Sequence, residues 1–192
     1  MILGITGGTG CGKTTLLNVI QAQGGLVLDC DAIYHGLLKT DEKLLSAIDA
    51  RFPGVVENGE LNRKKLGTLV FHDESALSDL NRITHAAIRA EVLRLLEPMP
   101  ALAAIDAIAL FESGLAKLCG ITVAVTAPVE DRVKRLIRRD GISEEYARSR
   151  IAAQHDDGWF RSRCDYVLVN DGSEADFSQK CLAFLHQFRI MV

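Results

Sequence analysis

The stretch of sequence that decides the fold is Gly7–Thr14, which reads GGTGCGKT and fits the pattern Gly-x4-Gly-Lys-Ser/Thr. The apolar residues 1–6 before it predict a buried strand, and residues 15–23 after it predict a helix. Where a strand, a glycine-rich loop and a helix follow one another, backbone N–H groups wrap phosphate oxygens and the helix N-terminus adds its positive end. The sequence therefore predicts a nucleoside triphosphate site here, rather than a glycine-rich turn with a chance lysine.

Individual residues of this loop have distinct expected roles. Lys13 is expected to reach the β- and γ-phosphates, and the Thr14 hydroxyl to ligate Mg²⁺. The nucleotide-binding residues predicted from the loop are Gly8, Thr9, Gly10, Cys11, Gly12, Lys13, Thr14 and Thr15.

The bulk composition narrows the class of protein. The chain has 192 residues, a length typical of one domain, and 22 basic against 25 acidic residues. Without a basic excess we expect no nucleic-acid partner, and without an apolar run near the roughly 18 residues of a membrane span we expect no membrane partner. The five widely spaced cysteines indicate reduced thiols of a cytoplasmic protein. We read the first residues as a strand, not a signal peptide, and expect a monomer or weak homo-oligomer.

Four further apolar segments predict strands of the same sheet. Continuous rather than alternating apolar residues indicate strands that are buried on both faces, as in a parallel sheet between helices. The expected fold is thus α/β, a P-loop NTPase-type parallel sheet with flanking helices. The segments are residues 26–28, 102–105, 121–126 and 166–169.

The uneven spacing of these strands predicts two excursions from a single domain. Apolar residues recur at helical spacing between Leu77 and Leu96, and Pro98 and Pro100 are expected to end that helix. We therefore expect a helical lobe and a lid in a nucleotide-binding core; the family resemblance described below implies that this lobe binds the acceptor. The expected bounds are about 1–30, 101–127 and 164–192 for the core, 31–100 for the lobe and 128–163 for the lid.

The expected lid begins with a charged helix. Pro128 suits its first turn, Gly141 is expected to end it, and Ser143 to cap the next helix. Val133, Leu136 and Ile137 predict a narrow apolar stripe on this helix. The default interpretation of the basic residues around the stripe is a face exposed to solvent. That default is our prediction for Arg132 and Lys134, whereas Arg138 and Arg139 are candidates both for a solvated face and for contacts to phosphate.

Two motif comparisons favour a kinase over a GTP-driven switch. No aspartate is followed three positions later by glycine, and the pair Asn-Lys of the guanine-binding motif does not occur. Asp29 and Asp31 directly follow the strand 26–28, in a position where loops face the ligand of an α/β sheet. We predict that Asp29 caps the next helix or a local turn. Asp31 is predicted to have the functional role, which is either to accept the proton of an attacking hydroxyl or to help hold Mg²⁺.

Several segments in one order make the chain similar to a known family. These are Gly4–Thr14, Asp29–His35, Leu61–Phe71, Leu80–His85, Leu110–Gly114, Arg138–Ser143, Arg150–Gln154 and Asp165–Asn170. In them the sequence resembles the dephospho-CoA kinase family, whose members transfer a phosphoryl group from ATP to the ribose 3′-hydroxyl of dephospho-CoA. The resemblance departs from the family pattern at Ala86, where proline is usual, and at Ile108–Leu110, where Pro-Leu-Leu is usual; both bear on the fit of the acceptor pocket.

The resemblance implies roles for single residues. Asp31 resembles the catalytic aspartate, Arg138 or Arg139 the lid arginine, and Asn170 a residue near the adenine of ATP. The implied substrates are ATP and dephospho-CoA, with Mg²⁺ as the metal. The implied acceptor-binding residues are Asp31, His35, Arg63, Arg82 and His85, of which His35 and Arg63 also suit a purely local structural role.

Alternatives remain open from the sequence. Asp106, at the end of a predicted strand, suits a water-mediated contact to Mg²⁺ and equally a turn or helix cap. Another small-molecule kinase, such as a nucleoside or nucleotide kinase, would share the phosphate loop. So would a regulatory protein that binds a nucleotide and hydrolyses it poorly.

Overall fold

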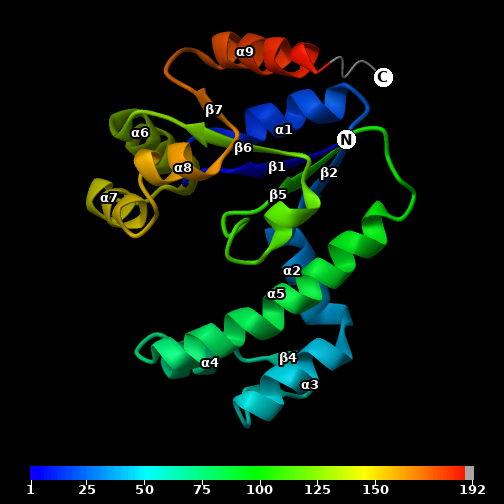
Figure 1. Ribbon diagram of the computed structural model, residues 1–192. Helices are drawn as coiled ribbons and strands as arrows, with labels where there is room; N and C mark the ends of the chain where they lie inside the picture. The colour runs from blue at the N-terminus through cyan, green and yellow to red at the C-terminus, as the bar shows by residue number, and fades with distance from the viewer. Residues whose placement is uncertain (189–192) are drawn as a thin grey trace. The chain divides into compact units, whose positions relative to one another are not determined.

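The structure is a computed structural model that describes residues 1–188, and Figure 1 shows its ribbon. The last four residues of the expected core segment 164–192 lie outside the described residues. The chain divides into two compact units. The first combines Met1–Leu28 with the chain from Pro100 onward, and the second is Asp29–Met99.

The first unit is built on a five-stranded sheet with the order β2-β5-β1-β6-β7. β1 pairs in parallel with β5 and β6, and β6 pairs in parallel with β7. Leu3 and Ile5 of β1 are fully buried, as expected of a central strand with helices on both faces. All five predicted strands are confirmed: β1 (Ile2–Thr6), β2 (Leu26–Asp29), β5 (Ala103–Asp106), β6 (Ile121–Thr126) and β7 (Tyr166–Val169).

Two helices cover one side of this sheet together (Figure 1). They are α1 (Lys13–Ala22) and α9 (Glu174–Gln187). Leu16 and Ile20 of α1 are fully buried, and Phe177 and Leu185 of α9 join the same apolar cluster. This packing fixes the direction of α1, so the loop that enters its N-terminus is held by the core.

The excursion after β6, which is the chain between β6 and β7, forms three helices: α6 (Val129–Asp140), α7 (Glu144–Ala152) and α8 (Asp157–Arg163). A 3₁₀ helix, η1 (Leu115–Leu118), precedes β6. Gly141 ends α6 with φ 65°, and the Ser143 hydroxyl accepts a hydrogen bond from the Tyr146 N–H, so both predicted caps are confirmed. Pro128 is the N-cap and lies one residue before the helix, not in its first turn. The apolar stripe is narrower than predicted, because Ile137 is exposed and only Val133 and Leu136 are buried.

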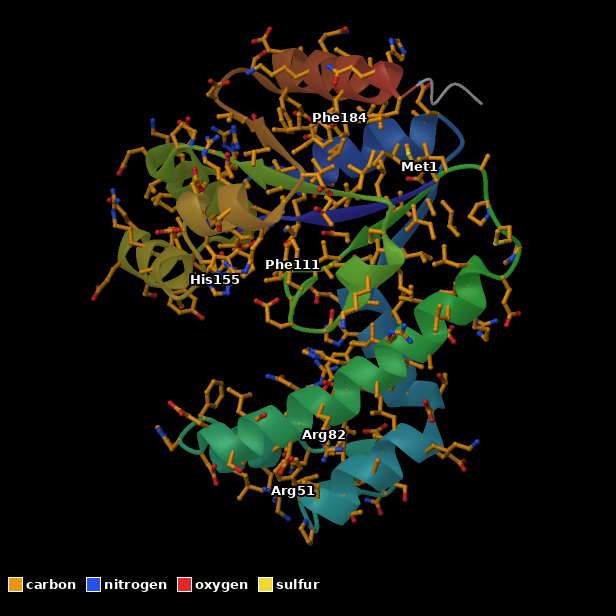
Figure 2. The ribbon with its side chains drawn as sticks, viewed as in Figure 1. Met1, Arg51, Arg82, Phe111, His155 and Phe184 are labelled. Carbon is orange, nitrogen blue, oxygen red and sulfur yellow. The ribbon has the colours of Figure 1, made fainter. Side chains whose placement is uncertain are left out.

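The second unit is a helical bundle with a small hairpin. Its elements are α2 (Cys30–Thr40), α3 (Glu42–Arg51), β3 (Val56–Glu57), β4 (Glu60–Leu61), α4 (Arg63–Val70) and α5 (Glu74–Leu96). Ile48, Phe52 and Val55 are among the residues of its own apolar core. α5 confirms the long predicted helix, and Figure 2 shows Arg51 and Arg82 among the side chains on this unit.

Sequence reasoning missed the hairpin of β3 and β4. Each strand has two residues, too few to show alternation. The signal that could have found it is the turn, because Asn58 and Gly59 have φ values of 53° and 81°, and an Asn-Gly pair with positive φ at both positions is typical of tight hairpins. No helix within residues 1–188 combines the length and the apolar character needed to cross a membrane.

Candidate functional site

The loop between β1 and α1 has the geometry of a phosphate cradle. Gly7, Gly10 and Gly12 have φ values of 135°, 76° and 92°, a region of backbone conformation that favours glycine. The Lys13 Nζ donates a hydrogen bond to the Gly7 carbonyl oxygen at 2.9 Å, so the lysine side chain lies back across its own loop. The predicted strand–loop–helix arrangement is confirmed.

Backbone donors of this loop are available to an anion. Within residues 1–188, no chain atom accepts a hydrogen bond from the backbone N–H groups of Gly10, Gly12, Lys13 or Thr14. Two of these groups belong to the first turn of α1, where the helix also contributes a partial positive charge. Thr14 is exposed, so its hydroxyl is accessible. Donors in this arrangement suit the oxygens of a phosphate chain.

Thr9 is held on both sides by residues from the excursion after β6. Its N–H donates to the Gln154 Oε1 at 2.7 Å, and its carbonyl oxygen accepts from the Arg132 Nε at 2.9 Å. Arg132 is only 4% exposed, so the prediction of a solvated Arg132 is wrong. The physical reason is that the Thr9 carbonyl oxygen and the Gln154 Oε1 accept hydrogen bonds from the guanidinium and replace its water. Lys134, by contrast, is exposed as predicted.

A second pair of side chains packs against the far half of the loop. The buried Asn170 donates from Nδ2 to the Cys11 carbonyl oxygen at 2.9 Å. Arg135 donates to the carbonyl oxygens of Gly10 and Cys11, each at 3.3 Å, and to the Asn170 Oδ1 at 3.2 Å. A Cβ added to Gly12 would lie 2.3 Å from the Asn170 Nδ2, so a side chain does not fit there. Asn170 is thus brought to the phosphate loop.

Cys11 contributes to the site through its backbone. Its side chain is 1% exposed, and burial raises the pKa of the thiol, although the charges of Arg132 and Lys13 oppose that rise. The thiol therefore stays neutral at physiological pH. Thr15, the last predicted residue of the loop set, donates its N–H to the Gly12 carbonyl oxygen at 3.1 Å and so closes the first turn of α1.

The two aspartates after β2 differ as predicted. The Asp29 Oδ1 accepts hydrogen bonds from the N–H groups of Asp31 and Ala32, at 2.9 and 3.0 Å, so the predicted cap is confirmed. Asp31 lies in the first turn of α2 and is exposed. Its carboxylate makes no hydrogen bond to any residue in the part of the chain that is described. Its oxygens are therefore available to a bound ligand.

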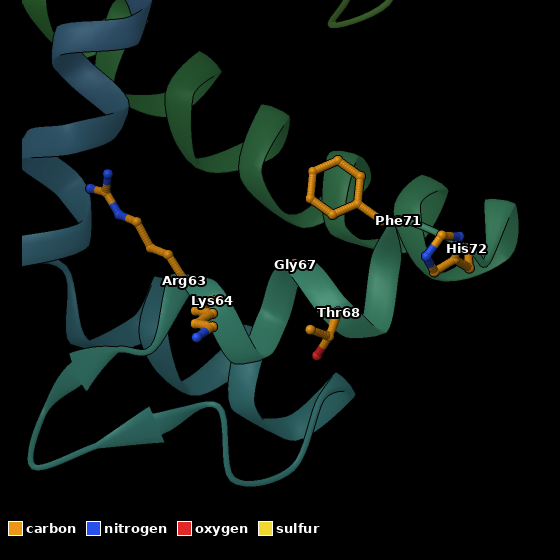
Figure 3. Close-up of a pocket in the computed structure, with 6 residues that line it drawn as sticks. All are labelled: Arg63, Lys64, Gly67, Thr68, Phe71 and His72. Carbon is orange, nitrogen blue, oxygen red and sulfur yellow. The ribbon is translucent and has the colours of Figure 1, made fainter.

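The second unit brings two of the predicted acceptor-binding residues together. The Arg63 Nη2 lies 3.1 Å from the His35 Nδ1, and Asp31 and His35 share a face of α2 at i and i+4. Arg63 also lines a cavity of about 620 Å³, shown in Figure 3, with Lys64, Gly67, Thr68, Phe71 and His72. The exposed Phe71 ring and the basic residues give this cavity both an apolar and a cationic lining.

Arg82 and His85 lie on α5 of the same unit, one turn apart at i and i+3. The Arg82 Nη2 is 3.4 Å from the Asp79 Oδ1, and its side chain is 73% exposed. Asp79 also accepts from the Arg51 Nε at 2.7 Å, and these bonds, that of Arg51 above all, hold the pKa of the Asp79 carboxyl below its ordinary value. His85 is half-buried.

Arg138 and Arg139 are exposed in the last turn of α6. Arg139 donates to both carboxylate oxygens of Asp140, at 2.7 and 3.0 Å, and Arg150 donates to the same carboxylate at 2.8 Å. These bonds, led by that of Arg139, lower the pKa of Asp140 to about 2. Among the described residues, neither Arg138 nor Arg139 donates a hydrogen bond to the phosphate loop.

Asp106 ends β5, and its register partner on β1 is Ile5, two residues before the phosphate loop. The residue is half-buried at the carboxyl end of the sheet, and its Oδ1 atom is buried. Sequence reasoning did not single out Arg135 or Gln154 as site residues. Gln154 ends one of the segments that resemble the family, but only its hydrogen bond to Thr9 reveals what it touches.

Comparisons with known proteins place this chain in a family. A sequence model of the family described as dephospho-CoA kinase matches residues 1–176. A dephospho-CoA kinase of Corynebacterium diphtheriae is 38% identical over 178 residues, which cover 90% of this chain and 89% of that protein. One of Geobacillus kaustophilus is 33% identical, with 98% and 96% covered. The chain belongs to the dephospho-CoA kinase family.

Solved structures agree with that membership. The crystal structure of a Thermus thermophilus protein superposes with a TM-score of 0.81 at 34% identity, over 97% of each chain. The dephospho-CoA kinase of Campylobacter jejuni gives 0.69 at 27% identity, with 97% of this chain and 96% of that one covered. A shikimate kinase of Bacteroides thetaiotaomicron, at 16% identity and a TM-score of 0.57, shares the fold alone. The predicted P-loop kinase-type fold, the family and the class of enzyme, an ATP-dependent kinase with an alcohol acceptor, are confirmed.

Proposed function

We propose that the protein transfers the γ-phosphate of ATP to the ribose 3′-hydroxyl of dephospho-CoA, the last step of coenzyme A biosynthesis. The observation that carries the proposal is the phosphate loop, with its available N–H donors and Lys13, in a chain that matches the family over residues 1–176. Phosphoryl transfer needs little covalent help from a protein, so a site that positions and neutralises phosphates supplies the main part of the catalysis.

The phosphate loop and Lys13 hold the triphosphate in this proposal. The accessible hydroxyl of Thr14, with Asp106 acting through water, would hold Mg²⁺, because oxygen ligands and substrate phosphates are what this ion prefers. When bound, Mg²⁺ supplies positive charge to the β- and γ-phosphate oxygens. Asn170 supports the loop from behind, and we assign it to the adenine end of the nucleotide.

Asp31 is the residue that we propose as the proton acceptor. Its exposed carboxylate orients the ribose hydroxyl and takes its proton late in the transfer. His35, Arg63, Arg82 and His85 bind the acceptor, whose diphosphate is an anion that suits cationic side chains. The contact between His35 and Arg63 and the basic lining of the neighbouring cavity support this assignment.

Arg138 and Arg139 are the proposed lid arginines. Arg138→Ala and Arg139→Ala should leave the thermal midpoint nearly unchanged, because both side chains are exposed and surface ion pairs contribute little to stability. At least one of the two should lower the turnover number by about tenfold or more, since a cation on the transferring group stabilises the transition state. Differential scanning fluorimetry and a coupled assay measure the two effects. Equal, modest losses of stability with parental turnover in both variants would show that these arginines only form a solvated face.

A panel of acceptors with γ-labelled ATP tests the proposed function. We expect transfer to dephospho-CoA and little to nucleosides, nucleoside monophosphates or water. Transfer to a nucleoside or a monophosphate, with dephospho-CoA left unmodified, would assign the chain to another class of small-molecule kinase. Slow hydrolysis alone would indicate a nucleotide-dependent regulatory protein. We further propose a cytoplasmic location and a monomer or weak homo-oligomer; the five free cysteines support the former.

A further inference from the structure

Arg132 is a buried cation whose hydrogen-bond partners are neutral. Its Nε donates to the Thr9 carbonyl oxygen at 2.9 Å, and its Nη2 to the Gln154 Oε1 at 3.3 Å. The residue is 4% exposed, and no carboxylate among residues 1–188 forms a salt bridge with it. Buried charges in proteins are normally paired, because removing a charge from water without a counter-charge is costly. Among the described residues Arg132 therefore has no salt-bridge partner, and a bound anion would supply the missing counter-charge.

The guanidinium lies directly against the phosphate loop. A Cβ added to Gly8 would come within 2.3 Å of the Arg132 Nη2 and 3.1 Å of the Gln154 Oε1. A Cβ added to Gly10 would lie 2.9 Å from the Arg132 carbonyl oxygen. The loop and the arginine thus share a surface without space for a side chain. A unit charge that lies against the loop and is buried from water would act strongly on phosphates bound there.

Gln154 fixes the orientation of this charge. Its Oε1 accepts from both the Thr9 N–H and the Arg132 Nη2, while the Arg132 Nε donates to the carbonyl oxygen of the same Thr9. The three residues form a closed ring of hydrogen bonds that connects the excursion after β6 to the phosphate loop. Because every member of the ring is neutral except Arg132, the ring holds the cation without cancelling its charge.

We infer that the buried guanidinium of Arg132 is a counter-charge for the bound triphosphate. Gln154 is the positioning residue that holds this guanidinium in its orientation. Arg132 acts through its contact with the loop residue Thr9, and its charge adds to that of Lys13. The inference rests on the proposed function in one respect, that the ligand is a nucleoside triphosphate. It adds that the affinity for ATP depends on a buried charge in the excursion after β6.

Gln154→Glu separates the charge of Arg132 from its structural contacts. The carboxylate keeps an acceptor for the Thr9 N–H and for the Arg132 Nη2, and it neutralises the guanidinium. We expect an unchanged or higher thermal midpoint together with an ATP dissociation constant raised about tenfold or more, measured by titration calorimetry. ADP should lose less affinity than ATP, because it carries less negative charge. The KM for ATP should rise while the KM for dephospho-CoA stays near the parental value.

Gln179→Glu is the matched control, because it makes the same change of charge at an exposed position of α9 and should bind ATP as the parent does. Parental ATP affinity in Gln154→Glu would overturn the inference. A large fall of its thermal midpoint would contradict it as well, because a buried cation in need of a counter-charge should gain one. The titration needs no acceptor, so a parent that binds ATP but phosphorylates another acceptor would refute the proposed function and leave this inference standing.

Discussion

Lys13→Ala is expected to lower the turnover of dephospho-CoA by about 10³-fold or more, because it removes a preorganised cation from the phosphates where charge develops. The cost to the fold should be small. Among the described residues the ammonium group donates one hydrogen bond, to the Gly7 carbonyl oxygen, and a hydrogen bond of a charged group contributes about 1.5–3 kcal/mol. Turnover should therefore fall much further than the free energy of unfolding.

A coupled assay at saturating substrates and a urea titration measure the two quantities. Lys43→Ala is the matched control, because Lys43 is an exposed lysine on α3 for which we propose no role. It should keep parental turnover. A folded Lys13→Ala variant that turns over as fast as the parent would remove Lys13 from the mechanism.

Asp31→Asn is expected to lower phosphoryl transfer by about 10²-fold or more while the affinity for ATP stays close to the parental value. The substitution keeps the size of the side chain and removes its charge and its capacity to accept a proton. The Asp31 carboxylate makes no hydrogen bond to a described residue, so the stability should fall only slightly, through the loss of a negative charge from the first turn of α2. ATP is expected to bind as well or slightly better, because a negative charge that would repel the γ-phosphate has been removed.

Asp29→Asn provides the control two residues away. Its Oδ1 caps α2 through two backbone N–H groups, and asparagine caps a helix about as well as aspartate. We expect near-normal transfer and a small loss of stability. Calorimetry with ATP and a transfer assay distinguish the two positions. If Asp29→Asn abolished transfer and Asp31→Asn did not, the assignment would be wrong and Asp29 would be the catalytic carboxylate.

The sheet and the phosphate loop could be predicted because their signals are local. Strands such as Ile121–Thr126 are continuous apolar runs, and the loop is a contiguous pattern between a strand and a helix. The helix caps could be predicted for the same reason, since the side chains of Asp29 and Ser143 accept hydrogen bonds from N–H groups two or three residues away. Each of these features depends on neighbours in the sequence, so the sequence contains what is needed to recognise it.

The environment of the basic residues could not be predicted in the same way. Arg132 and Lys134 are two positions apart in one charge-rich helix, yet one is buried and the other exposed. The difference arises from Thr9, 123 residues earlier, which receives the Arg132 side chain. A partial signal was present, because Arg132 lies four residues before the buried Leu136 and thus on the same face of the helix.

The contacts among the predicted acceptor-binding residues could not be predicted from the sequence either. Asp31 and His35 follow from the sequence as neighbours on one helix face, but the contact of His35 with Arg63 joins residues 28 positions apart. The resemblance to the family suggested both residues without their contact. Long-range pairing of this kind depends on how α2 and α4 pack, which local patterns do not specify.

The position of the transferred phosphate tests the central claim most directly. Dephospho-CoA would be incubated with the protein and γ-labelled ATP, and the product examined by ³¹P NMR and mass spectrometry. The account predicts one added phosphoryl group on the ribose 3′-hydroxyl, with the label retained and the diphosphate intact. A label found in inorganic phosphate alone, or on a different hydroxyl, would contradict it.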